Sequence, residues 1–397
     1  MLTVYSNSKY FSSRKLQVVA LTLIGLVILV LLVQDFRKAY RDQGNDFTSY
    51  LLSAEALLEG ENPYLTESEF TFIYPLFFAL LLTPLTVIPY WLAIFIWFGI
   101  NVAALFFSIR ILIRLASQQL GVQWGRHLYP PLAILLLLFF GIIQNNLLNG
   151  QVNFPVLLLC VLFLDNFLRK RLLFSSVFLA AACAIKLVPL ILLVYVILRR
   201  DFRVFFLTSV LFAGMCLLPA ISLGTDLFNI YDEYFHGFIL GKFSIRANAE
   251  DPSMFFTLHR FLTFLVPSSE QWLWLKYVAS GVVLTVTVIV DLLSLRKSGS
   301  LKEVWRFSLY LLAILLITPI SETHHLAYFI LVASLLVLRL LSVRWSTYKS
   351  VTVLMVGCLI CFFLGNAFET GPYYFISIAL LFLTTSFISL RRSVTDL

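Results

Sequence analysis

The side chain in this sequence that is best placed for acid–base chemistry is the carboxylate of Asp46. It follows the first apolar run, at about residues 16–34. It also stands at the start of a predicted helix over 47–58, which Gly60 and Pro63 end and whose apolar face carries Phe47, Tyr50, Leu51, Ala54 and Leu58. A carboxylate there could deprotonate an acceptor hydroxyl as a general base. It could equally cap the helix, and the spacing leaves both interpretations open.

Two further polar features lie within apolar sequence. Lys186 is the only charged residue between Leu172 and Leu198, and an ionisable residue in such a segment is a functional hypothesis by default. Its ammonium could bind a phosphate, or its long side chain could extend to the membrane interface. The segment 145–153, which includes Gln151, is rich in amides. Buried amides need hydrogen-bond partners, so this segment predicts either a polar cavity or a solvated turn.

A short polar segment, Ser321 to His325, separates two later apolar runs. One imidazole of His324 or His325 could hydrogen-bond a phosphate or orient a base, with capping or packing as the alternative. Adjacent histidines point to different sides of a helix, and no H-x-x-x-H or H-E-x-x-H pair occurs, so we predict no metal site. Farther upstream, Lys242 and Arg246 lie four residues apart and could contact one anion if that segment is helical.

The composition indicates a membrane protein. Of 397 residues, 60% are hydrophobic and 13% are charged, whereas about a quarter are charged in soluble domains. Apolar runs of about 20 residues favour membrane helices over a transmembrane barrel, which would show shorter alternating segments. The net charge of +8 comes from short basic clusters between apolar runs, as the positive-inside rule predicts, so we do not expect nucleic-acid binding. The five cysteines lie in apolar stretches, and a disulfide framework is not expected.

The basic clusters place both termini in the cytoplasm. An odd number of apolar segments connects the termini, so one segment must fail to cross the membrane. The segment 74–88 is the candidate, because it is short and bracketed by prolines, and Lys186 and Pro189 break a later pair of short segments apart. The apolar segments lie near 16–34, 74–88, 91–113, 129–146, 152–168, 172–185, 188–199, 203–221, 273–295, 305–320, 324–341, 350–365 and 373–390.

We therefore predict an all-α polytopic membrane protein, a single integral membrane domain over residues 1–397 with about 12 transmembrane helices and with helices in its extracytoplasmic loops. The first extracytoplasmic loop spans 35–73, and the long third one spans 222–272. These two loops hold most of the unusual polar residues, whereas the cytoplasmic loops are short and basic. The chemistry is therefore expected on the extracytoplasmic side of a plasma or inner membrane.

Five short motifs occur in a fixed order along the chain. They are Asn45-Asp46-Phe47-x-x-Tyr50-x-x-Ser53-Ala54-x-Ala56-Leu57-Leu58-x-Gly60-x-Asn62-Pro63-Tyr64, Tyr74-Pro75-Leu76-Phe77, Gly150-Gln151-Val152-Asn153, Ala184-Ile185-Lys186-Leu187-Val188-Pro189 and Ser321-x-x-His324-His325. In this order they resemble glycosyltransferase family 87, a member of the GT-C superfamily that includes polyprenyl-phosphate-mannose-dependent mannosyltransferases. The resemblance covers most of the chain, and Leu76 stands where the family has a second proline.

The resemblance implies a GT-C-type helical bundle and a hexosyltransferase without a metal ion or other cofactor. It implies transfer of a sugar, with mannose expected, from a polyprenyl-phosphate donor to a hydroxyl of a glycolipid or glycan acceptor, with inversion at the anomeric carbon. Asp46 matches the family's catalytic acid position, where it would act as the base, and His324 or His325 matches its outer-rim histidine. We assign the donor phosphate to Lys186, Arg246 and Gln151, and substrate binding to Tyr50, Tyr64, Asn153 and Glu322.

Two other functions fit parts of the pattern. An O-antigen polymerase or ligase also has many spans and a long outer loop with Arg and His, but it does not need Asp46, so Asp46→Ala would separate the two functions. A secondary transporter would commonly show inverted repeats and paired broken helices at the midplane of the membrane. The sequence shows one broken pair, at 172–199, without a counterpart.

Overall fold

The structure is a computed structural model. All regular elements in the part of the chain that it describes are helices, as the sequence predicts. The chain divides into two compact units, and the prediction of a single domain stays a prediction. Unit 1 comprises Met1–Gln34, Leu112–Gln144 and Pro252–Leu397, and unit 2 comprises Asp35–Ile111 and Asn145–Asp251. The described residues are 14–41, 46–120, 133, 136–237, 258–266, 274–298, 302–317, 323–341, 349–368 and 371–390.

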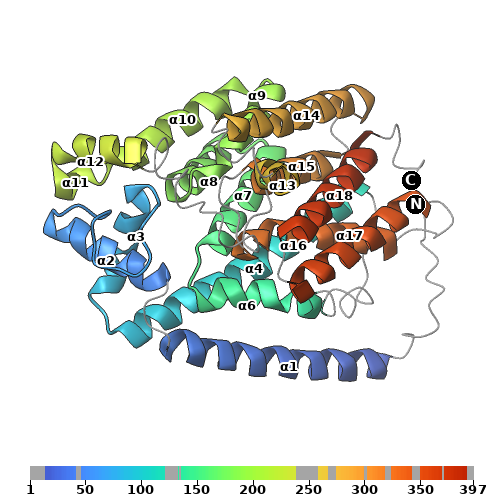
Figure 1. Ribbon diagram of the computed structural model, residues 1–397, viewed down its shortest axis with the longest axis horizontal. Coiled ribbons are helices and arrows are strands. Elements are labelled where there is room, and N and C mark those ends of the chain that lie inside the picture. Colours follow the sequence, from blue (N-terminus) through green and yellow to red (C-terminus); the bar gives the residue numbers. More distant parts are fainter. Residues whose placement is uncertain are drawn as a thin grey trace. The chain divides into compact units, whose positions relative to one another are not determined.

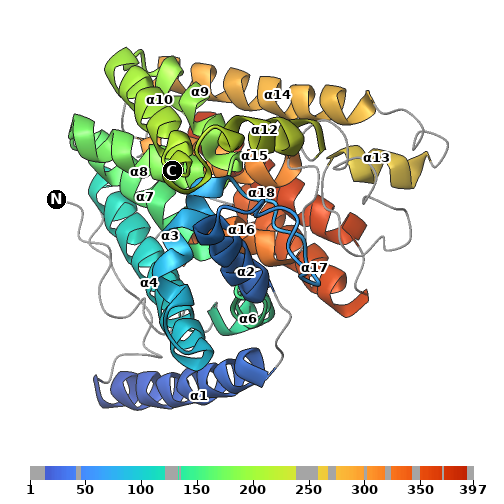
Figure 2. The same cartoon turned by 90° about the vertical axis from the view of Figure 1, so that its left-hand side faces the viewer.

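Unit 2 is built mostly from short helices (Figure 1). Within it α7 packs on α8, α8 packs on α10, and α2 packs on α3. Figure 2 shows α7, α8 and α10 side by side from a second direction. The helices of unit 2 are α2 (Asp46–Glu59), α3 (Leu76–Thr86), α7 (Asn153–Leu168), α8 (Leu172–Ile185), η3 (Val188–Leu190), α9 (Ile191–Leu198), α10 (Phe202–Leu217), α11 (Ala220–Leu223) and α12 (Asp226–Tyr234). Three helices begin in one unit and end in the other: α1 (Arg14–Arg41), α4 (Tyr90–Leu120) and α6 (Phe140–Leu148).

Helix α2 confirms the helix predicted over 47–58. Its predicted apolar face is buried except at its last residue, Leu58, which is 51% exposed, contrary to the expectation. The helix ends where Gly60 adopts a left-handed conformation with φ +76°, a conformation that glycine reaches without the strain a Cβ would add. The N–H of Glu61 then donates to the carbonyl of Ala56 at 2.8 Å, which satisfies one of the last carbonyls of the helix.

The two loops expected on the extracytoplasmic side contact each other within unit 2. The side-chain amide of Asn62 donates to Glu233 Oε2 in α12 at 2.9 Å. The hydroxyl of Tyr234 donates to the carbonyl of Ile73 at 3.1 Å. These contacts join segments more than 150 residues apart in sequence, since their separations are 171 and 161 residues. Both loops therefore help to position the chain that leads into α3.

Two breaks interrupt the apolar helices of the described chain. The predicted break at Lys186 is confirmed, because α8 ends one residue before it and Lys186 is extended, with φ −146° and ψ 130°. A second break separates α6 from α7, whose axes differ by 112°. The sequence predicted only one broken pair, so this expectation was wrong. The turn at 149–152 accounts for the difference, because it bends the chain between the two helices without a proline.

Membrane-spanning helices are fewer in the described chain than the sequence predicted. Four are long and apolar enough to cross a bilayer, or five if the bent pair of α6 and α7 counts as one span. The prediction of about 12 is therefore not confirmed. Helix α3, in the segment expected not to cross, has 11 residues and is about 16 Å long, about half the thickness of the hydrocarbon core. The four are Tyr90–Gln118, Phe202–Leu223, Tyr277–Arg296 and Tyr373–Leu390.

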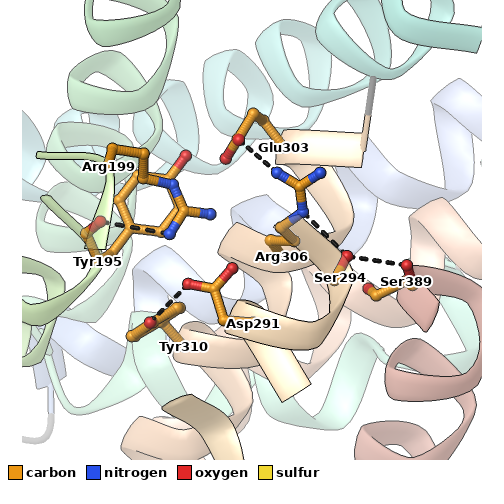
Figure 3. Close-up of polar contacts among 8 residues, drawn as sticks. All are labelled: Tyr195, Arg199, Asp291, Ser294, Glu303, Arg306, Tyr310 and Ser389. Atoms are coloured by element: carbon orange, nitrogen blue, oxygen red, sulfur yellow. Dashed lines mark hydrogen bonds and ion pairs between the residues drawn. The ribbon is translucent and has the colours of Figure 1, made fainter. Parts of the chain in front are cut away.

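In unit 1, α14 packs on α15, and α15 and α17 pack on α18. A buried polar network links α14, α15 and α18 (Figure 3). Arg306 donates through Nη1 to Glu303 Oε1 at 2.5 Å and through Nε to Ser294 Oγ at 2.9 Å. Arg306 is fully buried. The helices of unit 1 are α13 (Leu258–Leu265), α14 (Leu275–Ser298), α15 (Glu303–Ile317), η9 (Thr323–Leu326), α16 (Ala327–Leu341), α17 (Lys349–Phe368) and α18 (Gly371–Leu390).

Figure 3 also draws an arginine of unit 2. Arg199 directly follows α9, and its guanidinium lies 3.5 Å from the centre of the Tyr195 ring. Its Nη1 donates to the carbonyl of Tyr195 at 3.3 Å. A cation over an aromatic face is attracted by the ring quadrupole. Arg199 therefore helps to hold the end of α9.

Candidate active site

The carboxylate of Asp46 lies in the first turn of α2, where the sequence placed it. Its Oδ2 accepts a hydrogen bond from Gln151 Nε2 at 2.5 Å. Phe47 anchors this end of the helix, because its side chain is fully buried and its ring stacks on Trp97 with centres 5.7 Å apart. Asp46 itself is partly exposed. The carboxylate is thus both anchored in the protein and accessible, as a proton acceptor must be.

The amide-rich segment forms the turn that carries Gln151. Gly150 adopts φ +62°, and the N–H of Gln151 donates to the carbonyl of Asn146 at 2.9 Å, a hydrogen bond that closes the end of α6. Trp97 Nε1 donates to the carbonyl of Gly150 at 2.6 Å and fixes the turn from α4. Gln151 is 2% exposed and Asn146 and Asn153 are fully buried. The solvated-turn interpretation is therefore wrong, and these amides line the protein interior.

The cation of the site is the ammonium of Lys186, in the break between α8 and η3. Its Nζ donates to Asn153 Oδ1 at 2.7 Å, and Asn153 Nδ2 donates in turn to Asn146 Oδ1 at 3.1 Å. Lys186 is 8% exposed, so its ammonium points into unit 2 rather than out to a water interface. An ammonium has three N–H donors, and charge-assisted hydrogen bonds from such a group to phosphate oxygens are among the strong ones in proteins.

Tyr74 connects the carboxylate side and the cation side of this site. Its hydroxyl donates to Gln151 Oε1 at 3.4 Å and accepts from the Tyr50 hydroxyl at 3.1 Å. The centre of its ring lies 5.6 Å from Lys186 Nζ, within the range of a cation–π contact. The sequence analysis quoted Tyr74 as part of a motif but gave it no role. Its position directly before Pro75 was the available signal.

Tyr64 supports Tyr74 from the other side of the loop. Its hydroxyl donates to the backbone carbonyl of Tyr74 at 2.9 Å, and its ring stacks on Tyr234 with centres 4.9 Å apart. Burial raises the pKa of the Tyr64 hydroxyl well above its usual range, with a further contribution from Tyr234, so it stays protonated and remains a donor. Tyr50, Tyr64 and Asn153, assigned from sequence to substrate binding, are all buried and contact other residues of the site.

The two histidines lie in unit 1, within η9. His324 is 7% exposed and His325 is 8% exposed, and their ring centres lie 4.3 Å apart at an angle of 39°. The expectation that the two rings point to different sides is therefore wrong, because the rings pack against each other. Arg246 and Glu322, assigned to the donor phosphate and to substrate, lie outside the described residues.

Comparison with known proteins identifies one family. The sequence model of glycosyltransferase family 87 matches residues 72–319. This range begins just before Tyr74 and contains Gln151, Asn153 and Lys186, which are the residues that form the site with Asp46. No curated protein and no solved structure shows a significant match to the chain.

Proposed function

Because the chain belongs to glycosyltransferase family 87 and is thus a membrane glycosyltransferase, we propose that it transfers a sugar from a polyprenyl-phosphate donor to a hydroxyl of a glycolipid or glycan. Mannose is the sugar we expect, and the reaction inverts the anomeric carbon. The site faces the extracytoplasmic side of a plasma or inner membrane, and both termini are cytoplasmic. One observation supports this proposal most. Asp46 accepts a hydrogen bond from the Gln151 amide, Lys186 donates one to the Asn153 amide, and Tyr74 contacts both Gln151 and Lys186.

Asp46 is the general base in this proposal. The acceptor oxygen attacks the anomeric carbon, and its proton passes to the carboxylate as the new glycosidic bond forms. A carboxylate has about four lone-pair sites, so the hydrogen bond from Gln151 to Oδ2 leaves further acceptor capacity. That hydrogen bond also stabilises the ionised form of Asp46, which is the form that can accept a proton.

Lys186 stabilises the leaving group. The bond between the anomeric carbon and the phosphate oxygen breaks, and its electron pair leaves with the polyprenyl phosphate. A cation fixed in advance where negative charge develops lowers the barrier, because it needs no reorganisation during the reaction. The leaving phosphate is already an anion, so the reaction does not require a metal ion. From the sequence alone, His324 or His325 and Arg246 stay proposed for the phosphate, and Glu322 stays proposed for the substrate.

The test is a transfer assay with purified protein in nanodiscs. Labelled polyprenyl-phosphate-mannose, and then other labelled polyprenyl-phosphate sugars, are supplied with a panel of glycolipid and sugar acceptors, and Asp46→Asn is compared with wild type. Asparagine has nearly the shape of aspartate and is as favourable at a helix N-terminus, so this variant removes the base with little effect on the start of α2. We expect kcat to fall by about 10²- to 10⁴-fold.

Asp226→Asn is the matched control. Asp226 also lies in the first turn of a helix, α12, but it is exposed, so its variant should keep the wild-type rate. Equal turnover by Asp46→Asn would overturn the assignment of the base. Absence of product with every polyprenyl-phosphate sugar would overturn the donor class.

A further inference from the structure

Four side chains form a continuous hydrogen-bonded series that ends at Asp46. The Tyr50 hydroxyl donates to the Tyr74 hydroxyl at 3.1 Å, which donates to Gln151 Oε1 at 3.4 Å. Gln151 Nε2 then donates to Asp46 Oδ2 at 2.5 Å. The three donors are 1%, 5% and 2% exposed, so water does not compete for these hydrogen bonds. The series is a property of unit 2 alone.

The hydroxyl of Tyr74 sets the orientation of the Gln151 amide. An amide has an accepting oxygen at one end and a donating NH₂ group at the other. Because the Tyr74 hydroxyl already accepts the Tyr50 proton, its own proton is directed to Gln151 Oε1. The NH₂ group must then face the carboxylate. An amide turned the other way would place two acceptors, Gln151 Oε1 and Asp46 Oδ2, against each other, an arrangement that only a protonated carboxyl would tolerate.

The chain around Tyr74 makes its position rigid. A residue before proline is restricted to extended conformations, and Pro75 directly follows it. Its carbonyl is held by Tyr64, and its ring packs edge-on against Tyr50 and Phe78 with ring centres 5.3 and 5.5 Å away. A hydroxyl fixed in this way can select one orientation of a neighbouring amide at little further loss of entropy.

We propose that Tyr74 and Gln151 are positioning residues for the transfer reaction: the Tyr74 hydroxyl orients the Gln151 amide, and that amide holds the Asp46 carboxylate ionised and aimed at the acceptor. This inference rests on the proposed function, because it assigns a role relative to the general base. The hydroxyl and the ring of Tyr74 serve different partners. The hydroxyl acts on the carboxylate side, and the ring face contacts the ammonium of Lys186.

The pH profile reports this role. Losing a hydrogen bond to an ionised carboxylate favours the protonated form, so the acid limb of kcat/KM should move upward by about one to two pH units. Besides its own members, the titratable or charged groups that contact the series or its neighbours among the described residues include Lys186, Tyr64 and, beside Phe47, Tyr90. Helices α3 and α11, which pack on α2, carry no titratable side chain.

The experiment compares Tyr74→Phe, Gln151→Met and their double variant with wild type in the nanodisc assay. Tyr74→Phe removes one oxygen and keeps the ring, so folding is preserved, as circular dichroism and size-exclusion chromatography will check. We expect each single variant to lower kcat by about 10- to 100-fold, with the KM for the donor unchanged within about twofold. The double variant should lose no more than the larger single loss, because the two residues act in series.

Tyr231→Phe is the matched control. It also removes a tyrosine hydroxyl that donates to a backbone carbonyl, that of Cys216 at 2.9 Å, and it should keep the wild-type kcat and pH profile. Wild-type kcat in Tyr74→Phe, or losses that multiply in the double variant, would overturn the inference while Asp46→Asn remains inactive. An inactive wild type, or an active Asp46→Asn, would instead overturn the proposed function.

Discussion

Gly150 lies so close to Phe47 that a Cβ atom built on Gly150 would be 2.5 Å from the Phe47 Cβ. This close approach brings the residues next to each of them together. Asp46 precedes Phe47 and Gln151 follows Gly150, and their side chains share the hydrogen bond at 2.5 Å. The absence of a side chain at Gly150 is therefore a condition for the contact between the carboxylate and the amide.

Gly150→Ala should damage both stability and activity. The φ of +62° is strained for alanine, and the added methyl group would push the start of α2 away. We expect a loss of about 1–3 kcal/mol in the free energy of unfolding and a larger loss of kcat than that destabilisation explains. Gly99→Ala is the control, because Gly99 is exposed in α4 and no atom lies within 4 Å of its built Cβ. A Gly150→Ala variant with wild-type thermal stability would contradict this prediction.

Lys186→Met should lower kcat/KM by about 10²- to 10³-fold, since it removes a fixed positive charge from the proposed site of the leaving phosphate. The loss should include a weaker affinity for the donor, measured by titration of polyprenyl phosphate. Lys170→Met is the control: Lys170 is exposed in the turn after α7, and its cation lies 5.3 Å from the Phe167 ring. If Lys186→Met binds polyprenyl phosphate as tightly as wild type, the assignment of Lys186 to the phosphate site is wrong.

Alkaline pH should destabilise the protein partly through Tyr64. Burial raises its pKa in the folded state, whereas in the unfolded chain it ionises near pH 10. Its stabilising effect is therefore complete below about pH 10, and the free energy of unfolding falls as the pH rises above that value. Denaturation between about pH 8 and pH 11 should show this fall, with a smaller slope in Tyr64→Phe. The same slope in both proteins would show that Tyr64 does not contribute.

The buried ion pair in unit 1 should contribute far more to stability than an exposed one. Arg306→Met leaves the Glu303 carboxylate buried without its charged partner, and we expect a loss of about 3–5 kcal/mol. Arg169→Met is the control. Arg169 pairs with Asp165 at 3.0 Å but its side chain is 39% exposed, and the expected loss is under about 1 kcal/mol. Thermal unfolding in detergent measures both, and similar losses would contradict the prediction.

Local patterns predicted the elements that carry the site. Asp46 at the helix start and the spacing of the apolar residues predicted the bounds of α2 closely. The single charged residue Lys186, followed by Pro189, predicted the break after α8. Motif order gave the family. Each of these signals lies within about 20 residues of sequence, where periodicity and turn chemistry decide the structure.

Long-range pairing could not be predicted in the same way. The sequence assigned Gln151 to the donor phosphate, which stays a prediction, but it did not predict the hydrogen bond from the Gln151 amide to Asp46. The position of Tyr74 before Pro75 signalled a restricted backbone but not a role, because only tertiary contacts reveal what its hydroxyl touches. The predicted number of spans stays unconfirmed in the described part of the chain, because hydropathy does not distinguish a short apolar helix, such as α8, from one that crosses a bilayer.

The separation of 105 residues between Asp46 and Gln151 has a consequence for the biogenesis of the protein. At about 5–20 residues per second, a ribosome needs roughly 5–20 s to make the chain between them. During that interval α2 is already synthesised, but the groups that hold its carboxylate are not. The site is therefore incomplete during this part of synthesis. The protein can become active only after the segment with Lys186 has also been made and inserted.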